Sequence, residues 1–208
     1  FLTVFSGEPG CGKTSVCSVI AETMGLVHLE KKLAETSAWS GDRCDRFLTV
    51  PVERGWTSKR DFLGYFNPLT QSFSTNDRRR YDAFRLLDIE AGTAERPLLP
   101  FIFLLDEANL SPMEYYWADF MRICGGDEQS DKDIVLADNL VCRIPDHLRF
   151  LATINIDDTT EPLSPRLLDR AWIVRLPQPD FTAAQKAPGA ADSVTWKDFV
   201  TAFGGHDR

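Results

Sequence analysis

The sequence predicts an α/β fold in which a parallel β-sheet is flanked by helices. Short apolar runs bounded by turn residues recur five times, at residues 2–5, 47–52, 101–105, 148–153 and 171–176. The segments between these runs have helical character, and strands that alternate with helices favour a parallel sheet covered on both faces. A glycine-rich loop between the first apolar run and the first helical segment is typical of the same fold class.

Local start and stop signals define the expected helices. Residues 14–24, "TSVCSVIAETM", follow the glycine-rich loop, and "RRRYDAFRLLDIEA" follows Asp77. "SPME" at residues 111–114 has the pattern of a capping box with proline at the first helical position. We therefore expect a helix that begins there, runs to about Cys124 and stops at Gly125-Gly126.

Two further signals lie in the last third of the chain. The stretch "IVLADNLVCRI" predicts a β-hairpin with its turn at Asp138-Asn139. Ser164-Pro165 repeats the helix-start signal just before "RLLDR". A short helix should therefore precede the fifth strand.

The composition is that of a soluble globular domain with no membrane segment. The chain has 208 residues, of which 43% are hydrophobic and 26% charged, and its net charge of -8 argues against a surface that clamps nucleic acid along its whole length. Five scattered cysteines without a C-x-x-C pair indicate neither a disulfide framework nor a zinc site, so we expect a cytoplasmic protein. No apolar run has membrane-spanning length and no signal peptide is recognisable. Because Phe1 already stands in a strand, we expect a fragment of a longer protein.

The loop after the first strand matches the phosphate-binding pattern G-x-x-x-x-G-K-[ST]. Backbone N–H groups of such a loop surround phosphate oxygens, the lysine reaches the β- and γ-phosphates, and the hydroxyl residue ligates Mg²⁺. We expect this loop and the residue after it to bind the nucleotide: Gly7, Glu8, Pro9, Gly10, Cys11, Gly12, Lys13, Thr14 and Ser15. Cys11 also lies near a helix N-terminus, where a thiol can become reactive, although a small residue that fits the loop is the simpler interpretation.

An acidic pair ends the most apolar run of the chain. Asp106 and Glu107 close the stretch "FIFLLDE", and a buried parallel strand delivers its last residues to the carboxyl edge of the sheet, where ligands of open α/β folds bind. There Asp106 is expected to hold Mg²⁺ with Thr14, and Glu107 to polarise the attacking water. A water-polarising glutamate beside the magnesium aspartate favours hydrolysis over the alternative of a small-molecule kinase.

With these residues in place, the chain resembles the AAA+ ATPases, and specifically their McrB-like branch. The resemblance is carried by residues 50–70, 104–121 and 148–171, in addition to the phosphate loop. It implies the large AAA+ subdomain of a P-loop NTPase over residues 1–180, and a truncated start of the helical lid over residues 181–208. The nucleotide implied is ATP, with GTP as the alternative, together with Mg²⁺.

The resemblance also implies roles for two residues near the fifth strand. Asn155, at the end of the strand beside the acidic pair, is similar to the sensor residue that positions the lytic water. Arg170 is similar to the arginine finger that reaches the nucleotide of a neighbouring subunit, and Arg166 is the alternative candidate. The expected catalytic residues are thus Lys13, Glu107, Asn155 and Arg170.

The partners implied by the resemblance are copies of the same chain, in a ring that is expected to be a hexamer. A nuclease subunit is a possible effector, as in a restriction or defence complex, and nucleic acid could be bound through domains outside this chain. The rival interpretation is an assembly scaffold in which nucleotide binding, rather than turnover, matters.

Two weaker features have competing interpretations. The run Arg78-Arg79-Arg80 could face a pore or nucleic acid, but a solvated helix face is the commoner use of such a run. The aromatic residues Trp56, Tyr65 and Phe66 with Asn67 could stack on bases, although packing in the core or at an interface is favoured.

Overall fold

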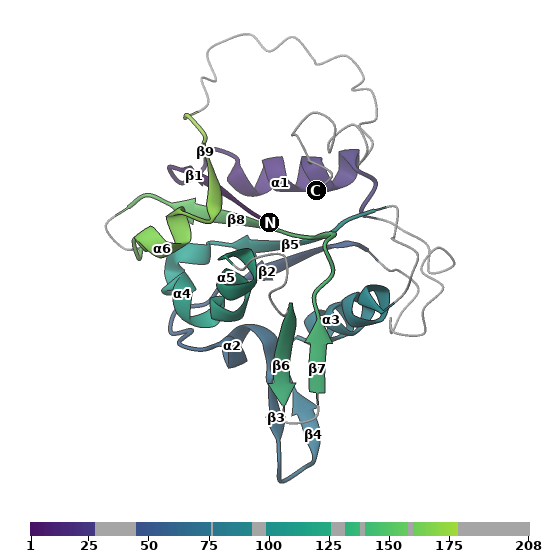
Figure 1. The fold of residues 1–208 in the computed structure, drawn as a ribbon. Coiled ribbons are helices and arrows are strands. Elements are labelled where there is room, and N and C mark those ends of the chain that lie inside the picture. Colours follow the sequence, from purple (N-terminus) through teal and green to yellow (C-terminus); the bar gives the residue numbers. More distant parts are fainter. Residues whose placement is uncertain are drawn as a thin grey trace.

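A five-stranded parallel sheet forms the centre of the protein in the computed structural model (Figure 1). The structure describes residues 1–27, 45–75, 77–92, 99–125, 132–137, 140–157 and 160–178. The strand order is β2-β5-β8-β1-β9, and all four pairings are parallel. The strands are β1 (Leu2–Gly7), β2 (Phe47–Pro51), β5 (Phe101–Asp106), β8 (Leu148–Asn155) and β9 (Ala171–Arg175). The five apolar runs therefore became the five strands, and the expected fold class is confirmed.

Alternate residues of β5, which has a neighbouring strand on each side, pack against opposite faces of the sheet. Ile102 and Leu104 point to one face, where they pack in a cluster with Cys17 and Ala21 of α1 (Lys13–Thr23). Phe103, between them in sequence, lies in the larger cluster on the other face. Because both faces are covered, β5 contains only apolar residues before Asp106.

The larger core cluster is built around aromatic rings from four helices and from the strands β5 and β8. These helices are α2 (Lys59–Leu63), α3 (Arg78–Ala91), α4 (Met113–Tyr116) and α5 (Ala118–Gly125), and they lie on the side of the sheet opposite α1 (Figure 1). Phe62 of α2 is fully buried and contacts the rings of Phe84, Phe103, Phe120 and Phe150. Edge-to-face and tilted contacts of this kind add to the free energy gained from burial alone.

The expected capping box at Ser111 is wrong, although a helix does begin at Met113 and helical structure ends at Gly125 as expected. Ser111 does not cap a helix: its hydroxyl donates to the Glu53 carbonyl oxygen at 2.9 Å and accepts from the Trp56 N–H at 3.1 Å. The segment after it forms the single turn α4, ends at Trp117 with φ -110°, and resumes as α5 up to Gly125. A hydroxyl that already satisfies two backbone groups of a distant loop cannot also serve the helix N-terminus.

The other helix signals are confirmed. Ser164 is the N-cap residue of α6 (Pro165–Leu168), with proline at the first turn, and the Asp77 carboxylate caps α3 by accepting from the Arg79 N–H. A capping box that sequence reasoning did not find lies at Ser58, where Asp61 accepts from the Ser58 N–H at 2.9 Å.

Two β-hairpins project away from the sheet at the lower end of the view in Figure 1. They are formed by β3 (Tyr65–Asn67) with β4 (Ser72–Ser74), and by β6 (Asp133–Ala137) with β7 (Leu140–Arg143), both antiparallel. The second is the hairpin predicted from sequence, although its turn at Asp138-Asn139 lies outside the described residues, as does the segment 181–208. A short 3-10 turn, η2 (Ala108–Leu110), connects β5 to α4.

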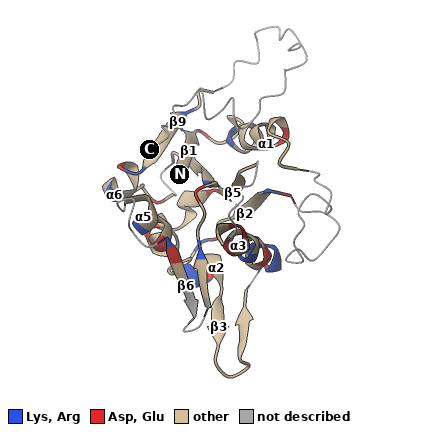
Figure 2. Cartoon of the chain, turned by 45° about the vertical axis from the view of Figure 1, so that its right-hand side comes forward, with Lys and Arg blue, Asp and Glu red and all other residues tan. Residues whose placement is uncertain are grey.

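The charged run of α3 divides between solvent and core. Figure 2 shows basic and acidic residues together on this helix, and Arg78 and Arg79 are exposed and paired with Asp82 and Asp77. Arg80 is only 5% exposed, donates to the Phe62 carbonyl oxygen at 2.8 Å and lies over the Trp56 ring. The solvated-face interpretation therefore holds for the first two arginines and is wrong for the third.

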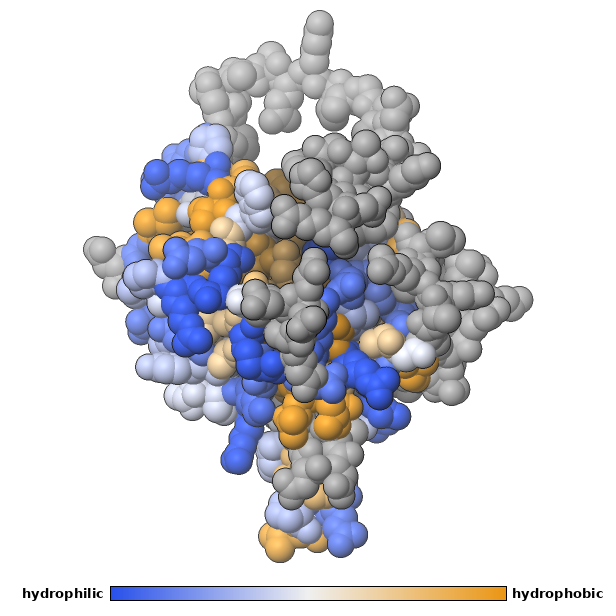
Figure 3. All heavy atoms as spheres, viewed as in Figure 1, coloured by the Kyte–Doolittle hydropathy of each residue, from blue (hydrophilic) through white to orange (hydrophobic). Residues whose placement is uncertain are grey.

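The aromatic residues grouped in the sequence do not form one cluster. Trp56 is buried in the core, whereas Tyr65 and Phe66 are exposed on β3. Figure 3 shows other apolar residues on the surface over β9, where Trp172 is 79% exposed.

None of the helices in the described part of the chain has the length and apolar character needed to span a membrane.

A buried ionic cluster joins four elements at the amino end of the sheet. Arg46, just before β2, makes a bidentate pair with Glu90 of α3 at 2.7 and 2.9 Å and also donates to the Pro100 carbonyl oxygen. His147, just before β8, contacts the same carboxylate at 2.7 Å. Burial alone would raise the pKa of Glu90, but hydrogen bonds from His147 and Arg46 outweigh it and lower this pKa to about 2.

Candidate functional site

The phosphate loop lies at the carboxyl end of β1 and leads directly into α1. Gly10 and Gly12 have φ values of 81° and 87°, in the left-handed region that glycine adopts without steric cost, and Gly12 is the N-cap residue of α1. Glu8, Pro9 and Gly10 are exposed at the tip of the loop. The chain therefore turns sharply enough to aim the backbone N–H groups of an 11-residue helix at the loop.

The first glycine of the loop is required by close contacts. A Cβ atom at Gly7 would lie 2.7 Å from the Cys11 sulfur and 2.8 Å from the Leu176 carbonyl oxygen. Contacts this short do not occur for real Cβ atoms, and the Leu176 oxygen belongs to backbone that cannot simply rotate away. Only glycine at this position allows the start of the loop to pack between Cys11, near the end of the loop, and Leu176, which follows β9.

Lys13 bridges the mouth of the loop. Its ammonium group donates to the carbonyl oxygens of Gly7 at 3.0 Å and Glu8 at 2.8 Å, and the side chain is buried. The Cys11 sulfur is 3.8 Å from the same nitrogen. The ammonium group thus directs two protons to carbonyl oxygens and the third to this sulfur, a weak acceptor that an oxyanion inside the loop would readily replace.

The loop and the acidic pair, 92 residues apart in sequence, meet through a hydrogen bond. The Thr14 hydroxyl donates to Asp106 Oδ1 at 2.9 Å. A hydroxyl and a carboxylate side by side at a phosphate loop fit Mg²⁺, which prefers oxygen ligands, keeps several waters and takes one or two protein groups beside the phosphates of its substrate. Thr14 and Asp106 are the residues that would hold this ion.

Glu107 leaves the end of β5 in an unusual backbone conformation. Its φ is 54°, which a non-glycine residue adopts at a cost of roughly 1–2 kcal/mol, and its side chain is exposed. The N–H of Glu107 donates to the Thr153 hydroxyl at 2.9 Å. Because the turn separates the two acids, Asp106 faces Thr14 while the carboxylate of Glu107 remains open to solvent.

Asn155 ends β8 in register with Gly7, so it lies beside the start of the phosphate loop. Its backbone is fixed by Asn109 of η2: the Asn109 amide donates to the Asn155 carbonyl oxygen at 2.8 Å, and the Asn155 N–H donates to the Asn109 side-chain oxygen at 3.2 Å. The same amide reaches the Glu161 carbonyl oxygen at 3.3 Å, on the segment that leads to α6.

Thr153 and Asn109 are site residues that sequence reasoning missed. Both are buried polar side chains whose partners lie 46 or more residues away. A weak signal existed in each case, because a threonine inside an apolar strand or an asparagine inside "LLDEANL" needs a partner when buried. Which partner it finds depends on the strand register.

Of the two candidate finger residues, Arg166 is in α6 and Arg170 directly precedes Ala171, which pairs with Leu2 at the end of β1 opposite the phosphate loop. Arg170 folds back on its own chain: one guanidinium nitrogen donates to the Arg166 carbonyl oxygen at 2.7 Å, and its Nε lies 2.6 Å from where a Cβ of Gly125 would be. The Arg170 Nε is buried and makes no hydrogen bond within the described part of the chain. The side chain of Arg166 is exposed.

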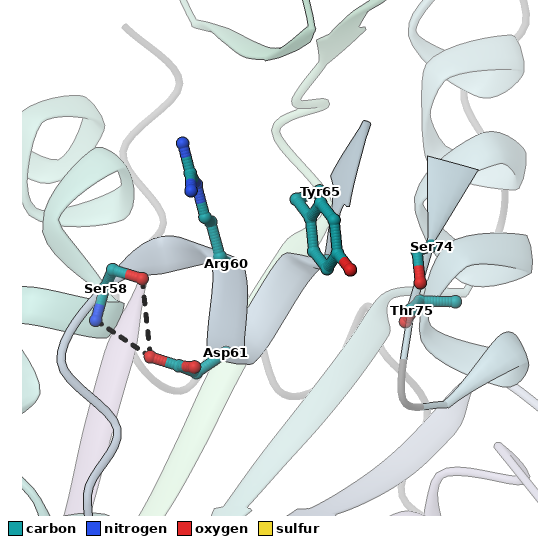
Figure 4. Close-up of a pocket in the computed structure, with 7 residues that line it drawn as sticks. Ser58, Arg60, Asp61, Tyr65, Ser74 and Thr75 are labelled. Atoms are coloured by element: carbon teal, nitrogen blue, oxygen red, sulfur yellow. Dashed lines mark hydrogen bonds between the residues drawn. The ribbon is translucent and has the colours of Figure 1, made fainter. Parts of the chain in front are cut away.

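Two cavities differ in their relation to the predicted site. A cavity of about 380 Å³ opens beside Gly7 and Glu8 and is bounded by Ile156, Arg175 and Gln178, among others. A second cavity, of about 240 Å³, lies between α2 and the β3–β4 hairpin (Figure 4). None of the predicted site residues lines the second cavity, and its one carboxylate, Asp61, is occupied by the capping box.

Comparisons with known proteins add little to this geometry. No protein-family model matches the chain, and no curated protein matches it. Among solved structures, a protein of Cytophaga hutchinsonii described as a "putative ATPase" is similar at 18% identity and a TM-score of 0.43, over 83% of this chain and 41% of that one. The chain thus spans less than half of that protein.

Proposed function

We propose that this chain hydrolyses a nucleoside triphosphate with the help of Mg²⁺, as the core module of an AAA+ NTPase. The observation that carries the proposal is the meeting of Thr14 and Asp106 at the mouth of the phosphate loop, with Glu107 on the open side of the same turn. A metal ion held there would neutralise phosphate charge as it develops. ATP is the expected nucleotide, and GTP is the alternative.

The residues have separate tasks in this proposal. Lys13 and the loop N–H groups bind the phosphates, because a cation and several amide dipoles converge on one point. Glu107 accepts a proton from the attacking water, for which its exposed carboxylate is accessible. Asn155, at the end of the strand between β1 and β5, contacts the phosphate that leaves.

The test of hydrolysis is Glu107→Gln, which removes the base and keeps the shape of the side chain. We expect turnover to fall about 10²- to 10⁴-fold while nucleotide binding is retained. Glu22→Gln is the matched control, since Glu22 is an exposed carboxylate on the last turn of α1. If Glu107→Gln hydrolyses nucleotide at the wild-type rate, the assignment of Glu107 as the base is wrong.

We further propose that the module works in a homo-oligomeric ring, of hexameric form, with an arginine acting on the neighbour's nucleotide. A guanidinium suits this task because it stays charged and binds two oxygens at once. Both arginines remain candidates for this role. Arg166 is exposed, whereas the Arg170 side chain is folded against Gly125. Arg170 requires release from its own chain, whereas Arg166 requires none.

Mixed assemblies decide between these arginines and test the ring. Lys13→Ala subunits lack a working loop, so when they are mixed with Arg170→Ala subunits, hydrolysis should recover in part if Arg170 acts in trans. The same mixture with Arg166→Ala tests the alternative. Recovery with neither variant, despite co-assembly shown by sedimentation, contradicts a trans-acting arginine in this segment.

The proposed biological role follows from the resemblance to McrB-like proteins. We propose that the ring drives an attached effector, such as a nuclease subunit of a restriction or defence complex, with nucleic acid bound through domains outside this chain. The rival is a scaffold in which nucleotide binding closes the ring. Glu107→Gln separates them, because a scaffold keeps its biological activity in this variant and a motor loses it.

A further inference from the structure

Thr153 occupies the one position of β8 that touches both acids of the site. The parallel register pairs Ala152 with Leu105, so the next residue of each strand, Thr153 and Asp106, lie side by side. Thr153 is only 1% exposed, which leaves its hydroxyl dependent on protein partners.

The chemistry of these partners fixes the direction of both hydrogen bonds. The Glu107 N–H, 2.9 Å from Thr153 Oγ1, can only donate, so the hydroxyl oxygen accepts there. The single hydroxyl proton is then left for Asp106 Oδ1, at 2.6 Å. That carboxylate oxygen also receives the Thr14 hydroxyl proton, so two donors hold one oxygen in place.

The second bond acts on the backbone of the base. Glu107 stands in the left-handed region, which a residue with a side chain leaves readily unless neighbouring contacts hold it. The hydrogen bond to Thr153 holds the backbone nitrogen of Glu107 against β8 of the central sheet. One hydroxyl therefore sets the orientation of Asp106 and the direction in which Glu107 leaves the strand.

We propose that Thr153 is a positioning residue for hydrolysis, acting through Asp106 on metal binding and through Glu107 on the attacking water. This inference rests on the proposed function. It adds to the proposed site a residue that belongs neither to the phosphate loop nor to the acidic pair, and that is distinct from Asn155. Loss of a buried, satisfied hydroxyl also costs stability, so the effect on the chemistry has to be compared with that of another buried hydroxyl away from the site.

Ser111 provides the matched comparison. Its hydroxyl is 2% exposed and has the same pattern of one donated and one accepted bond, to the Glu53 carbonyl oxygen and from the Trp56 N–H, but it touches neither acid. Loss of this hydroxyl measures what any buried, satisfied hydroxyl contributes to stability.

The experiment compares Thr153→Val, Thr153→Ser and Ser111→Ala in the full chain. Thr153→Val keeps the shape and removes the hydroxyl, so kcat should fall about 10- to 100-fold, the range found when a residue behind a metal ligand is lost. Thr153→Ser keeps the hydroxyl and should stay within about threefold of wild type. Ser111→Ala should lower the melting temperature comparably and leave kcat unchanged.

A binding measurement separates this inference from the proposed function. Titration of Mg²⁺ against a fluorescent ATP analogue should show a half-saturating Mg²⁺ concentration about tenfold higher for Thr153→Val, and near wild type for Thr153→Ser. This shift is expected even if the wild-type chain does not hydrolyse nucleotide, an outcome that overturns only the proposed function. If Thr153→Val does not fold, Thr153→Cys, whose thiol is a weak donor, takes its place.

The inference is wrong if folded Thr153→Val keeps both the wild-type kcat and the wild-type Mg²⁺ dependence. It is also wrong if Thr153→Ser loses as much as Thr153→Val, because a lost methyl group rather than the hydroxyl would then explain the effect.

Discussion

A substitution in the ionic cluster at the amino end of the sheet should lower the stability of the fold without altering the candidate nucleotide site. Glu90→Gln removes the carboxylate that Arg46 and His147 contact, and none of the three is near the phosphate loop at the opposite end of the strands. The pKa of Glu90 is lowered from 4.5 to about 2. At 1.36 kcal/mol per pH unit, this difference is worth about 3 kcal/mol of folding free energy at neutral pH.

The sign of the pH dependence follows from the lowered pKa. The folded state holds Glu90 ionised more firmly than the unfolded state, so its contribution is fully present above pH 4.5 and is lost as the pH falls toward 2. In Glu90→Gln this contribution is absent at every pH, and Arg46 is left buried with fewer partners, which adds to the loss. We therefore expect Glu90→Gln to be about 3–5 kcal/mol less stable at pH 7, and the gap to narrow below pH 4.5.

Urea unfolding followed by circular dichroism at pH 7, 5, 4 and 3 measures this gap, with Glu22→Gln as the control for loss of an exposed carboxylate. Hydrolysis by the folded fraction should be unchanged. A gap below 1 kcal/mol at pH 7, or one that stays constant down to pH 3, would refute the reasoning.

Three further predictions concern single contacts. Gly7→Ala should weaken nucleotide binding more than tenfold by fluorescence titration, since its Cβ meets the Leu176 oxygen at 2.8 Å, whereas Gly92→Ala, whose nearest atom is at 3.5 Å, should bind normally. Asn109→Ala should speed hydrogen exchange at the Asn155 amide and lower kcat about tenfold, as for other residues that orient a site from behind. Phe62→Ala, at a fully buried position, should cost about 3–5 kcal/mol in urea unfolding, and a smaller loss would contradict its place at the centre of the aromatic core.

The sequence determined the features that are local to one element. Each of the five apolar runs became a strand because a buried parallel strand needs only a short run of apolar residues between turns. The phosphate loop and the acidic pair were also readable, since their chemistry depends on residues that are neighbours in the chain. Their meeting at one sheet edge followed from strand polarity alone.

Only the tertiary structure decided the contacts that depend on register and on close packing. Ser111 looked like a helix cap and instead satisfies a loop 55 residues away. Arg80 looked like part of a solvated run and is buried over Trp56. Thr153 reaches the two acids because β8 pairs with β5 in one register, and a shift by one residue would turn its hydroxyl to the other face of the sheet. A pattern within one segment predicts that a polar side chain will be buried, but its partner is set by how distant segments align.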